Sequence, residues 1–216
     1  MTALKPVVLV GGGGHASDVL QAIEALNDSK PSFQVVGILD DREIAPRRFA
    51  GRGVAWIGPI EALGTIAAAY VVCVGWPWVR ADLVGRIGES AEPAPPIIHP
   101  KADVGVGAEL GAGTVVLGQA HLSPFVRLGN HSLVSYNASV GHDTIFGSCT
   151  SVMPNAAVSG DVEAGDRVLI GSGAVVREGL RLGHDVRVGA GAVVLADVVR
   201  GSTVVGNPAR PRPPRL

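Results

Sequence analysis

The 216-residue sequence predicts a small α/β unit with a Rossmann-like parallel sheet over residues 1–96, followed by a parallel β-helix over residues 97–216. Three observations predict this architecture. Short apolar runs alternate with helical segments in the first part, apolar residues recur at every sixth position from Ile98 onward, and Pro93, Pro95 and Pro96 separate the two patterns.

The first part contains short elements of both kinds. Strands are expected at residues 7–10, 35–39, 54–57 and 70–74, and helices at residues 17–26, 60–69 and 79–87. Strands that alternate with helices form a parallel sheet with helices packed on its faces. The first 96 residues therefore predict a single parallel sheet of modest size.

A glycine-rich turn joins the first expected strand to the first expected helix. Gly11-x-Gly13-x-x-Ala16 matches the dinucleotide-binding fingerprint, and the acidic pair Asp40-Asp41 closes the second strand. The N-terminus of a helix attracts phosphate oxygens, although a purely structural strand–helix turn has the same pattern. Fewer than 100 residues are too few for the two halves of an NAD-binding domain. This length favours a nucleotide or a nucleotide sugar as the ligand and disfavours a dehydrogenase.

The second part has an unbroken six-residue repeat. Seventeen consecutive positions at this spacing are apolar, and the next residue is glycine after nine of them. The seventeen positions are Ile98, Val104, Leu110, Val116, Leu122, Leu128, Val134, Val140, Phe146, Val152, Val158, Ala164, Ile170, Val176, Leu182, Val188 and Val194. A period of six fits neither a helix nor a simple strand, but it fits short strands that turn a corner. Three units then close one triangular coil, with aliphatic residues stacked inside and glycines allowing unusual backbone angles.

Composition narrows the class of protein. Eighteen Lys and Arg residues against 19 Asp and Glu residues give a net charge of −1, which offers no electrostatic footprint for nucleic acid. No apolar run reaches the roughly 18 residues of a membrane helix, and Val7–Val10 is too short for the core of a signal peptide. Cys73 and Cys149 cannot form a disulfide framework. We expect a soluble cytoplasmic protein.

The hexapeptide pattern resembles the left-handed parallel β-helix of hexapeptide-repeat acyltransferases, and the left-handedness is implied by that resemblance. Five motifs extend the resemblance over nearly the whole chain: Gly13-Gly14-His15, Leu39-Asp40-Asp41, Val74-Gly75 with Arg80, Gly141-His142-Asp143, and Gly206-Asn207-Pro208-Ala209-Arg210. In this combination the chain resembles the bacterial sugar O- and N-acyltransferases, which include sialic acid O-acetyltransferases and N-acetyltransferases of nucleotide-linked 4-amino sugars. The resemblance implies a sugar nucleotide on the N-terminal unit, a homotrimer, and acetyl-CoA in the cleft between neighbouring β-helices.

The resemblance also implies a role for each matched residue. His142 would be the general base, and Asp143 would orient it or raise its basicity. An imidazole suits this task because it titrates near neutral pH, and direct transfer from acetyl-CoA needs no covalent nucleophile. The implied substrate contacts are Gly13, Gly14, His15, Asp40, Asp41, Gly75 and Ser135, and the implied acetyl-CoA contacts are Ser151, Ser172, Gly173, Ala190, Asn207 and Arg210.

His184 competes with His142 for the role of base. It stands at the same place in its repeat unit and is followed by Asp185, but it lies about two coils further along. A zinc site of the γ-class carbonic anhydrase type, the rival enzyme class on this scaffold, is not expected. No two histidines have its five-residue spacing, and His121, His131 and His142 fall at different places around the 18-residue coil.

The resemblance therefore implies an acetyl-CoA-dependent N-acetyltransferase that acts on a nucleotide-linked amino sugar with a histidine base and no metal. A sugar O-acetyltransferase of the sialic acid type is one alternative, and a non-catalytic nucleotide-binding trimer is another. A histidine near the thioester in one family member is Ser151 here, and an asparagine near the base is Ser135. These departures leave the identity of the acceptor open. The sequence also does not fix the nucleotide, the acyl chain, or whether Arg210 and the proline-rich tail contact CoA.

Overall fold

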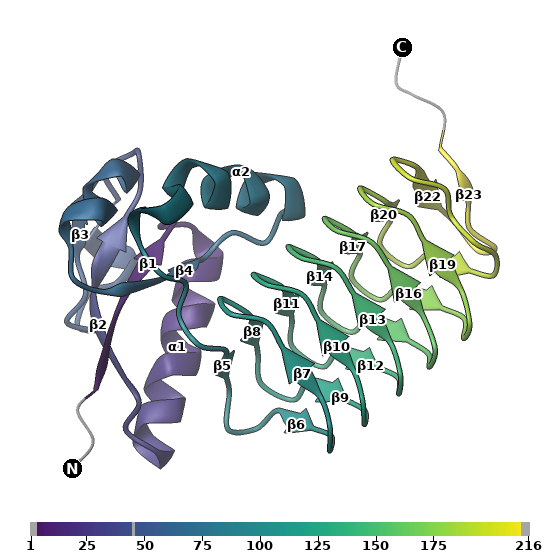
Figure 1. The fold of residues 1–216 in the computed structure, drawn as a ribbon, viewed down its shortest axis with the longest axis horizontal. Coiled ribbons are helices and arrows are strands. Elements are labelled where there is room, and N and C mark those ends of the chain that lie inside the picture. Colours follow the sequence, from purple (N-terminus) through teal and green to yellow (C-terminus); the bar gives the residue numbers. More distant parts are fainter. Residues whose placement is uncertain (1–3, 45, 213–216) are drawn as a thin grey trace.

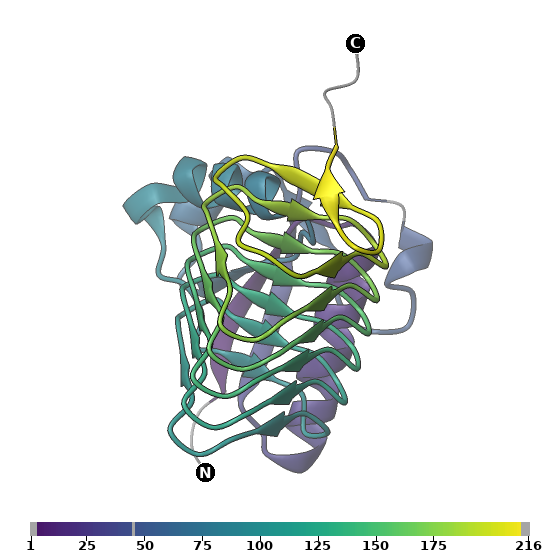
Figure 2. The same cartoon turned by 90° about the vertical axis from the view of Figure 1, so that its right-hand side faces the viewer.

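Both predicted units are present in the computed structural model, which describes residues 4–44 and 46–212. The α/β unit lies at one end of a long left-handed β-helix, whose coils run from teal to yellow in Figure 1. Figure 2 views the stack from its C-terminal end and shows the coils as rounded triangles. The fold class expected from the six-residue period and the strand–helix alternation is confirmed. None of the described helices is both long and apolar enough to cross a membrane.

The α/β unit contains a four-stranded parallel sheet in the order β3-β2-β1-β4. Its elements are β1 (Lys5–Val10), α1 (Gly14–Ser29), β2 (Phe33–Leu39), β3 (Trp56–Gly58), β4 (Ala69–Val72) and α2 (Pro77–Ile87), with 3-10 helices at Pro46–Arg48, Ile60–Thr65 and Gly88–Ser90. The central strand β1 is buried on both faces. Val7 and Leu9 pack in the core that includes α1, whereas Val8 and Val10 pack in the core that includes α2. Alternate residues of one strand thus serve two small cores.

The segment after β3 differs from the helix expected at residues 60–69. Only Ile60–Thr65 is helical, as a 3-10 helix, and β4 already begins at Ala69. Ile60 and Leu63 are the buried side chains of this segment. Residues three positions apart align on one side of a 3-10 helix, and such helices are rarely longer than one or two turns. The expected long helix was wrong because two apolar residues suffice to anchor a short turn here.

Three sheets form the faces of the β-helix, and up to β20 each strand residue pairs in parallel with the residue eighteen positions along. The first face holds β5 (Ile97–Ile98), β8 (Val115–Val116), β11 (Leu133–Val134), β14 (Ser151–Val152), β17 (Leu169–Ile170), β20 (Arg187–Val188), β22 (Thr203–Val205) and β23 (Arg210–Pro211). The second face holds β6 (Asp103–Val104), β9 (His121–Leu122), β12 (Ser139–Val140), β15 (Ala157–Val158), β18 (Val175–Val176) and β21 (Val193–Val194). The third face holds β7 (Glu109–Leu110), β10 (Arg127–Leu128), β13 (Ile145–Phe146), β16 (Glu163–Ala164) and β19 (Arg181–Leu182).

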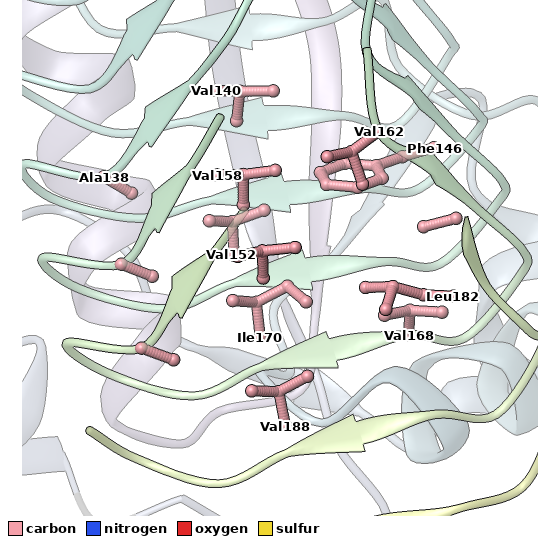
Figure 3. Packing of buried hydrophobic residues seen from close by; sticks show 14 of the residues in the cluster. Ala138, Val140, Phe146, Val152, Val158, Val162, Val168, Ile170, Leu182 and Val188 are labelled. Carbon is pink, nitrogen blue, oxygen red and sulfur yellow. The ribbon is translucent and has the colours of Figure 1, made fainter. Parts of the chain in front are cut away.

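The apolar positions of the repeat fill the interior of the β-helix, as expected. Fourteen of the seventeen belong to one buried cluster, and the three at the N-terminal end are partly buried against it. Figure 3 shows Val152, Ile170 and Val188 stacked in one column and Val140 next to Val158 in another. The inward-pointing apolar side chains of each coil therefore pack against those of the neighbouring coils, which is typical of a solenoid.

The repeat glycines do not adopt the unusual backbone angles expected of them. Left-handed φ values fall instead two residues later, at fifteen consecutive corners between Gly107 and Gly191, and ten of these fifteen residues are not glycine. A Cβ on eight of the nine repeat glycines would lie 2.3–2.7 Å from a backbone nitrogen of the next coil. For Gly141 the nearest such atom is the nitrogen of Gly160 at 2.3 Å. These glycines are needed because the coils approach one another closely, so the expectation about their backbone angles was wrong.

The α/β unit packs against the N-terminal part of the first face. Val19 and Ile23 of α1 share one buried cluster with Ile97, Val115 and Leu133 of the β-helix. These three β-helix residues alternate with the inward-pointing residues of the same strands, so their side chains point out of the coil toward α1. The two units thus share an apolar interface.

A buried arginine joins the two units further along the first face. Arg80 of α2 is only 2% exposed. Its guanidinium donates hydrogen bonds to His131 O (2.6 Å), Cys149 O (3.1 Å), Thr150 O (3.0 Å) and Ser151 Oγ (2.7 Å), and to Val74 O of its own unit. Burial lowers the pKa of Arg80 to about 10, so the side chain is still charged at neutral pH. Because His131 and Cys149 are eighteen residues apart, Arg80 bridges two successive coils.

His131 fills the interface beside Arg80. Its ring stacks on Tyr70 of β4 with the centroids 5.6 Å apart, and its Nδ1 has no hydrogen-bond partner among the residues described. Burial, and to a smaller extent the positive charge of Arg80, lowers the pKa of His131 to about 4. The imidazole is therefore neutral at physiological pH.

Replacing Arg80 by methionine should lower the free energy of unfolding by at least about 3 kcal/mol, because buried carbonyl oxygens would lose their donor. Denaturant unfolding followed by circular dichroism measures this change. Arg86→Met is the matched control on the same helix, since Arg86 pairs with Asp41 and Glu61 at the surface. Exposed pairs of this kind contribute roughly 1 kcal/mol or less. Equal losses in the two variants would contradict the role assigned to Arg80.

The depressed pKa of His131 predicts a specific loss of stability in acid. The unfolded chain binds a proton at His131 near pH 6.5, whereas the folded chain does so only near pH 4. The stability from the neutral ring is therefore complete above pH 6.5 and falls by up to about 3 kcal/mol as the pH drops to 4. His131→Asn keeps a residue that tolerates the left-handed φ of 57°. Its unfolding free energy should decline less steeply between pH 6.5 and 4.5 than that of the wild type, and parallel profiles would refute the prediction.

Candidate active site

The predicted base lies at an edge of the β-helix. His142 and Asp143 form the corner between β12 of the second face and β13 of the third face. Asp143 adopts a left-handed φ of 58°, and its Oδ2 lies 2.7 Å from Nδ1 of His142. Both side chains are more than half exposed, at 67% for His142 and 58% for Asp143. The pair is therefore open to a ligand or to another protein surface.

The hydrogen bond to Asp143 fixes the role of each nitrogen of His142. An ionised carboxylate only accepts hydrogen bonds, so Nδ1 of the imidazole carries the proton that it donates to Asp143. The lone pair of the neutral ring then resides on Nε2, which has no hydrogen-bond partner among residues 4–44 and 46–212. This arrangement presents a free proton acceptor at the edge of the β-helix.

His184 has the opposite arrangement, although it also lies beside acidic residues. The backbone N–H of Asp166 donates a 3.0 Å hydrogen bond to Nδ1 of His184, which therefore uses its lone pair in the fold. Asp185, the acid that follows it in the chain, makes two hydrogen bonds to Arg167 at 2.7 and 3.0 Å. The Arg167 guanidinium holds the pKa of Asp185 below its usual range. Within the described residues, His184 and Asp185 therefore do not form a pair like that of His142 and Asp143.

The other histidines have different surroundings. His121 on the second face bonds Asp103 through Nδ1 at 2.9 Å and Ser123 through Nε2 at 3.2 Å, which occupies both of its ring nitrogens. Nδ1 of His99 accepts a hydrogen bond from the backbone of Lys101. His131 is the buried interface residue described above. Among the described residues there is no group of three or more His, Cys, Asp or Glu side chains that could hold a metal ion.

The glycine-rich turn lies at the N-terminus of α1, as the fingerprint predicts. Gly13 is the N-cap residue of α1, and no side chain caps the helix. Asp40 holds the turn in place, because its Oδ2 accepts a 2.7 Å hydrogen bond from the backbone of Gly12. Its Oδ1 accepts another from the backbone of Arg42. Both oxygens of Asp40 are therefore already used by the loop, while backbone N–H groups of Gly14 and His15 remain at a free helix N-terminus.

Asp41 and His15 lie at the same edge of the sheet but have different partners. Arg86 of α2 binds both carboxylate oxygens of Asp41 at 2.8 and 3.2 Å, and this hydrogen bonding lowers the pKa of Asp41. Nδ1 of His15 lies 3.6 Å from Asp18 on the next turn of α1. The position of a Cβ on Gly14 would be 3.5 Å from Nη1 of Arg48. This arginine near the turn was missed by the sequence reasoning, because only folding of the segment after Asp41 brings it there.

Gly75 and Ser151 meet at the interface between the two units. The hydroxyl of Ser151 donates to the carbonyl of Gly75 at 2.8 Å and accepts a 2.7 Å hydrogen bond from Arg80. The hydroxyl of Ser151 is therefore fully used inside the protein, and the residue is completely buried. Ser135 lies one coil before it and is 6% exposed.

The remaining predicted acetyl-CoA residues lie along another part of the β-helix. Ser172, Gly173 and Ala190 are at the corners that follow β17 and β20, where the first face turns into the second. Asn207 and Arg210 belong to the last coil, and Arg210 is exposed in β23. The end of the proline-rich tail, residues 213–216, lies outside the described residues. In one chain these residues are thus on a different edge from His142.

A cavity of about 670 Å³ opens on the first face between α2 and the C-terminal coils. It is lined by Trp76 and Trp78, by Leu169, and by Arg187 and Arg212. The two indole rings stack with their centroids 5.2 Å apart, and the guanidinium of Arg187 lies 3.9 Å above the ring of Trp78. The sequence reasoning missed this cavity. The signal available in the sequence was the presence of Trp76 and Trp78, two of the three tryptophans in a chain with few aromatic residues.

A small α/β unit with a glycine-rich turn, fused to a left-handed β-helix that presents a His–Asp pair, defines the class of hexapeptide-repeat acyltransferases. Comparison with known proteins agrees with this class. Residues 6–87 match the family model of the PglD N-terminal domain. The acetyltransferase domain of PglB from Neisseria gonorrhoeae FA1090, also solved in complex with acetyl coenzyme A, is 30% identical. Its structure matches with a TM-score of 0.87 over 96% of this chain and 100% of that chain.

Two further relatives are similar. Perosamine N-acetyltransferase from Caulobacter crescentus is 28% identical, with a TM-score of 0.87 over 98% of this chain and 99% of that chain; the structure is of a histidine variant in complex with CoA and GDP-perosamine. The curated relative UDP-N-acetylbacillosamine N-acetyltransferase of Bacillus subtilis (strain 168) is 29% identical over 119 residues, or 53% of this chain. The match spans about half of that relative, 52% of its length. The chain belongs to the sugar acyltransferase family of these enzymes.

Proposed function

We propose that this protein is an acetyl-CoA-dependent N-acetyltransferase that acts on a nucleotide-linked amino sugar. The observation that carries the proposal is the His142–Asp143 pair, in which Nδ1 is occupied by the carboxylate and Nε2 is free. The similarity to two N-acetyltransferases and to the acetyltransferase domain of PglB, which is also solved with acetyl coenzyme A, supports the same reaction.

The amine must be neutral to attack, so its ammonium form first releases one proton to solvent. Nε2 of His142 then accepts a second proton from the nitrogen as it attacks the thioester carbonyl carbon. The resulting oxyanion is stabilised by hydrogen-bond donors, for which unpaired backbone N–H groups at the coil corners are candidates. Collapse of the tetrahedral intermediate forms the amide and breaks the C–S bond. His142 then returns the proton to the departing thiolate, so the products are the acetylated sugar and CoA.

Cys149 has no part in this scheme. Its side chain is 5% exposed, and burial raises the pKa of its thiol. Direct transfer from the thioester to the amine does not require a covalent nucleophile.

The nucleotide part of the acceptor is proposed to bind the α/β unit, residues 1–96. The N-terminus of α1 offers free backbone N–H groups at Gly13, Gly14 and His15 for phosphate oxygens. Arg48 lies near this turn and would add a positive charge. Because Asp40 already binds the backbone of Gly12, its proposed role is to hold the turn open for the ligand. Asp41 is fixed by Arg86 in the same way, at the edge of the site.

The acyl donor is proposed to lie along the β-helix, residues 97–216. Ser172, Gly173 and Ala190 offer backbone groups on two successive corners, and Asn207 and Arg210 follow in the last coil. Ser151 would contribute through its backbone, since its hydroxyl is bound to Gly75. The cavity lined by Trp76 and Trp78 adjoins these positions through Gly189. Its two arginines, Arg187 and Arg212, carry the positive charge that the phosphates of CoA require.

Assembly of a homotrimer is proposed because one chain keeps the parts of this site on different edges. The α/β unit covers the first face, whereas His142 lies at the opposite edge between the second and third faces. A neighbouring copy would bring its first face against this edge. The apolar side chains of Val106 and Phe125 on the same edge are 75% and 56% exposed, which favours a partner there. We place the protein in the cytoplasm, where acetyl-CoA and nucleotide sugars are made.

Two alternatives differ in what they predict. A sugar O-acetyltransferase of the sialic acid type would use the same base on a hydroxyl group, and analysis of the acetylated product distinguishes an amide from an ester. A non-catalytic nucleotide-binding trimer would bind nucleotide sugars without releasing CoA thiol.

Replacing His142 by alanine should lower turnover by about 10²–10⁴-fold, because the amine loses its base. CoA thiol release from acetyl-CoA measures this, with UDP- and GDP-linked 4-amino sugars as acceptors. His184→Ala is the matched control at the same place of its repeat unit, and it should keep nearly full activity. Full turnover in the His142 variant would sink the assignment of the base, and equal losses in both variants would indicate a structural effect.

The shared site predicts a trimer of about 66 kDa, three times the 22.0 kDa chain, in light scattering. Mixed trimers provide a second test. A His142→Ala copy keeps an intact glycine turn, and a copy with a damaged turn, such as Gly14→Asp, keeps its base. Refolding the two inactive variants together should restore part of the activity if each site uses both copies. A 22 kDa species, or no recovery in verified mixed trimers, would contradict the shared site.

A further inference from the structure

Gly160, the residue that stacks on His142 in the next coil of the β-helix, is unusual. Residues eighteen apart stack at the corner between the second and third faces, and this column contains Val106, Pro124, His142, Gly160 and Glu178. Gly160 is the only glycine among these five residues. Its neighbours in the column show that the corner accepts proline and charged side chains. The backbone also does not demand glycine there, because the φ of Gly160 lies outside the left-handed region.

Gly160 differs from the repeat glycines in what its missing side chain would touch. A Cβ on eight of the nine repeat glycines would meet the backbone of the next coil, which is a requirement of the fold. The three atoms nearest to a Cβ on Gly160 would all belong to the imidazole of His142, with Nε2 at 2.7 Å, Cε1 at 2.8 Å and Cδ2 at 3.1 Å. The space left by the glycine is therefore filled by the ring of the proposed base.

We propose that Gly160 is a positioning residue whose missing side chain lets the imidazole of His142 lie against the next coil while its Nδ1 reaches Asp143. This inference rests on the proposed function, because it gives the ring position a catalytic purpose. Any Cβ at residue 160 requires Nε2 to move by roughly 0.7 Å to regain ordinary contact at 3.4 Å. Nε2 is the atom that accepts the proton, so the displacement falls on the reacting centre.

Replacing Gly160 by alanine tests the proposal. Displacement of a catalytic group by about 1 Å can cost on the order of 10²-fold in rate. We expect kcat to fall roughly 10–100-fold, while KM for acetyl-CoA and for the nucleotide sugar stays within about twofold. Glu178→Ala is the matched control, since it changes the same column one coil further from His142 and should leave kcat unchanged. Wild-type kcat in Gly160→Ala would overturn the proposal.

A double variant separates positioning from a general structural effect. In a His142→Ala background the ring is absent, so Gly160→Ala should cause no further loss of the residual activity. A further loss as large as in the wild-type background would overturn the proposal. If Gly160→Ala unfolds the protein, the double variant should recover the wild-type melting temperature, because the clash is with the ring. Unfolding of both would instead assign Gly160 to the fold and overturn the proposal.

The outcomes also distinguish this inference from the proposed function. An inactive His142→Ala protein together with a fully active Gly160→Ala protein would reject the positioning role and leave the base assignment intact. Full activity of His142→Ala would reject the base itself, whatever the behaviour of Gly160→Ala.

Discussion

The parallel ladders that pair strand residues eighteen positions apart are the constraint on which the rest of the structure depends. They set each coil directly on the next, so identical places of the repeat form continuous columns. The stacked interior and the close approach of the repeat glycines follow from this spacing. The interface uses it too, since Arg80 bonds carbonyl groups of His131 and Cys149 on consecutive coils. The contact between His142 and Gly160 has the same origin.

The interior of the β-helix could be predicted from the sequence because one packing requirement recurs at every sixth residue. The purpose of the glycines could not be predicted in the same way. Glycine serves both where φ is positive, as at Gly107, and where another backbone comes close, as at Gly105. The sequence contains the same letter in both cases. Only the distance to the next coil, which is a property of the folded stack, tells them apart.

In the candidate site, too, a contact between adjacent residues could be predicted from the sequence, whereas contacts with distant residues could not. The His142–Asp143 contact joins adjacent residues, so a short motif was enough to predict it. The surroundings of His184 depend on partners one coil away, which its sequence motif does not reveal: Asp185 pairs with Arg167. Asp40 and Asp41 are neighbours with separate duties, since one holds the backbone of Gly12 and the other an arginine of α2. Long-range partners decide such roles, and the sequence pattern does not record them.

The hydrogen bonds by which Arg80 joins the two units have a consequence for how the amino-acid sequence can change. Four of its five acceptors are main-chain oxygens, and only Ser151 contributes a side chain. Hydrogen bonds to main-chain oxygens do not depend on which side chain the residue carries, so Cys149 can change while its carbonyl group still accepts from Arg80. His131 is an exception among the corner residues, because its ring also stacks on Tyr70. At this point of the interface, evolution is therefore constrained more by the shape of the coil corners than by their side chains.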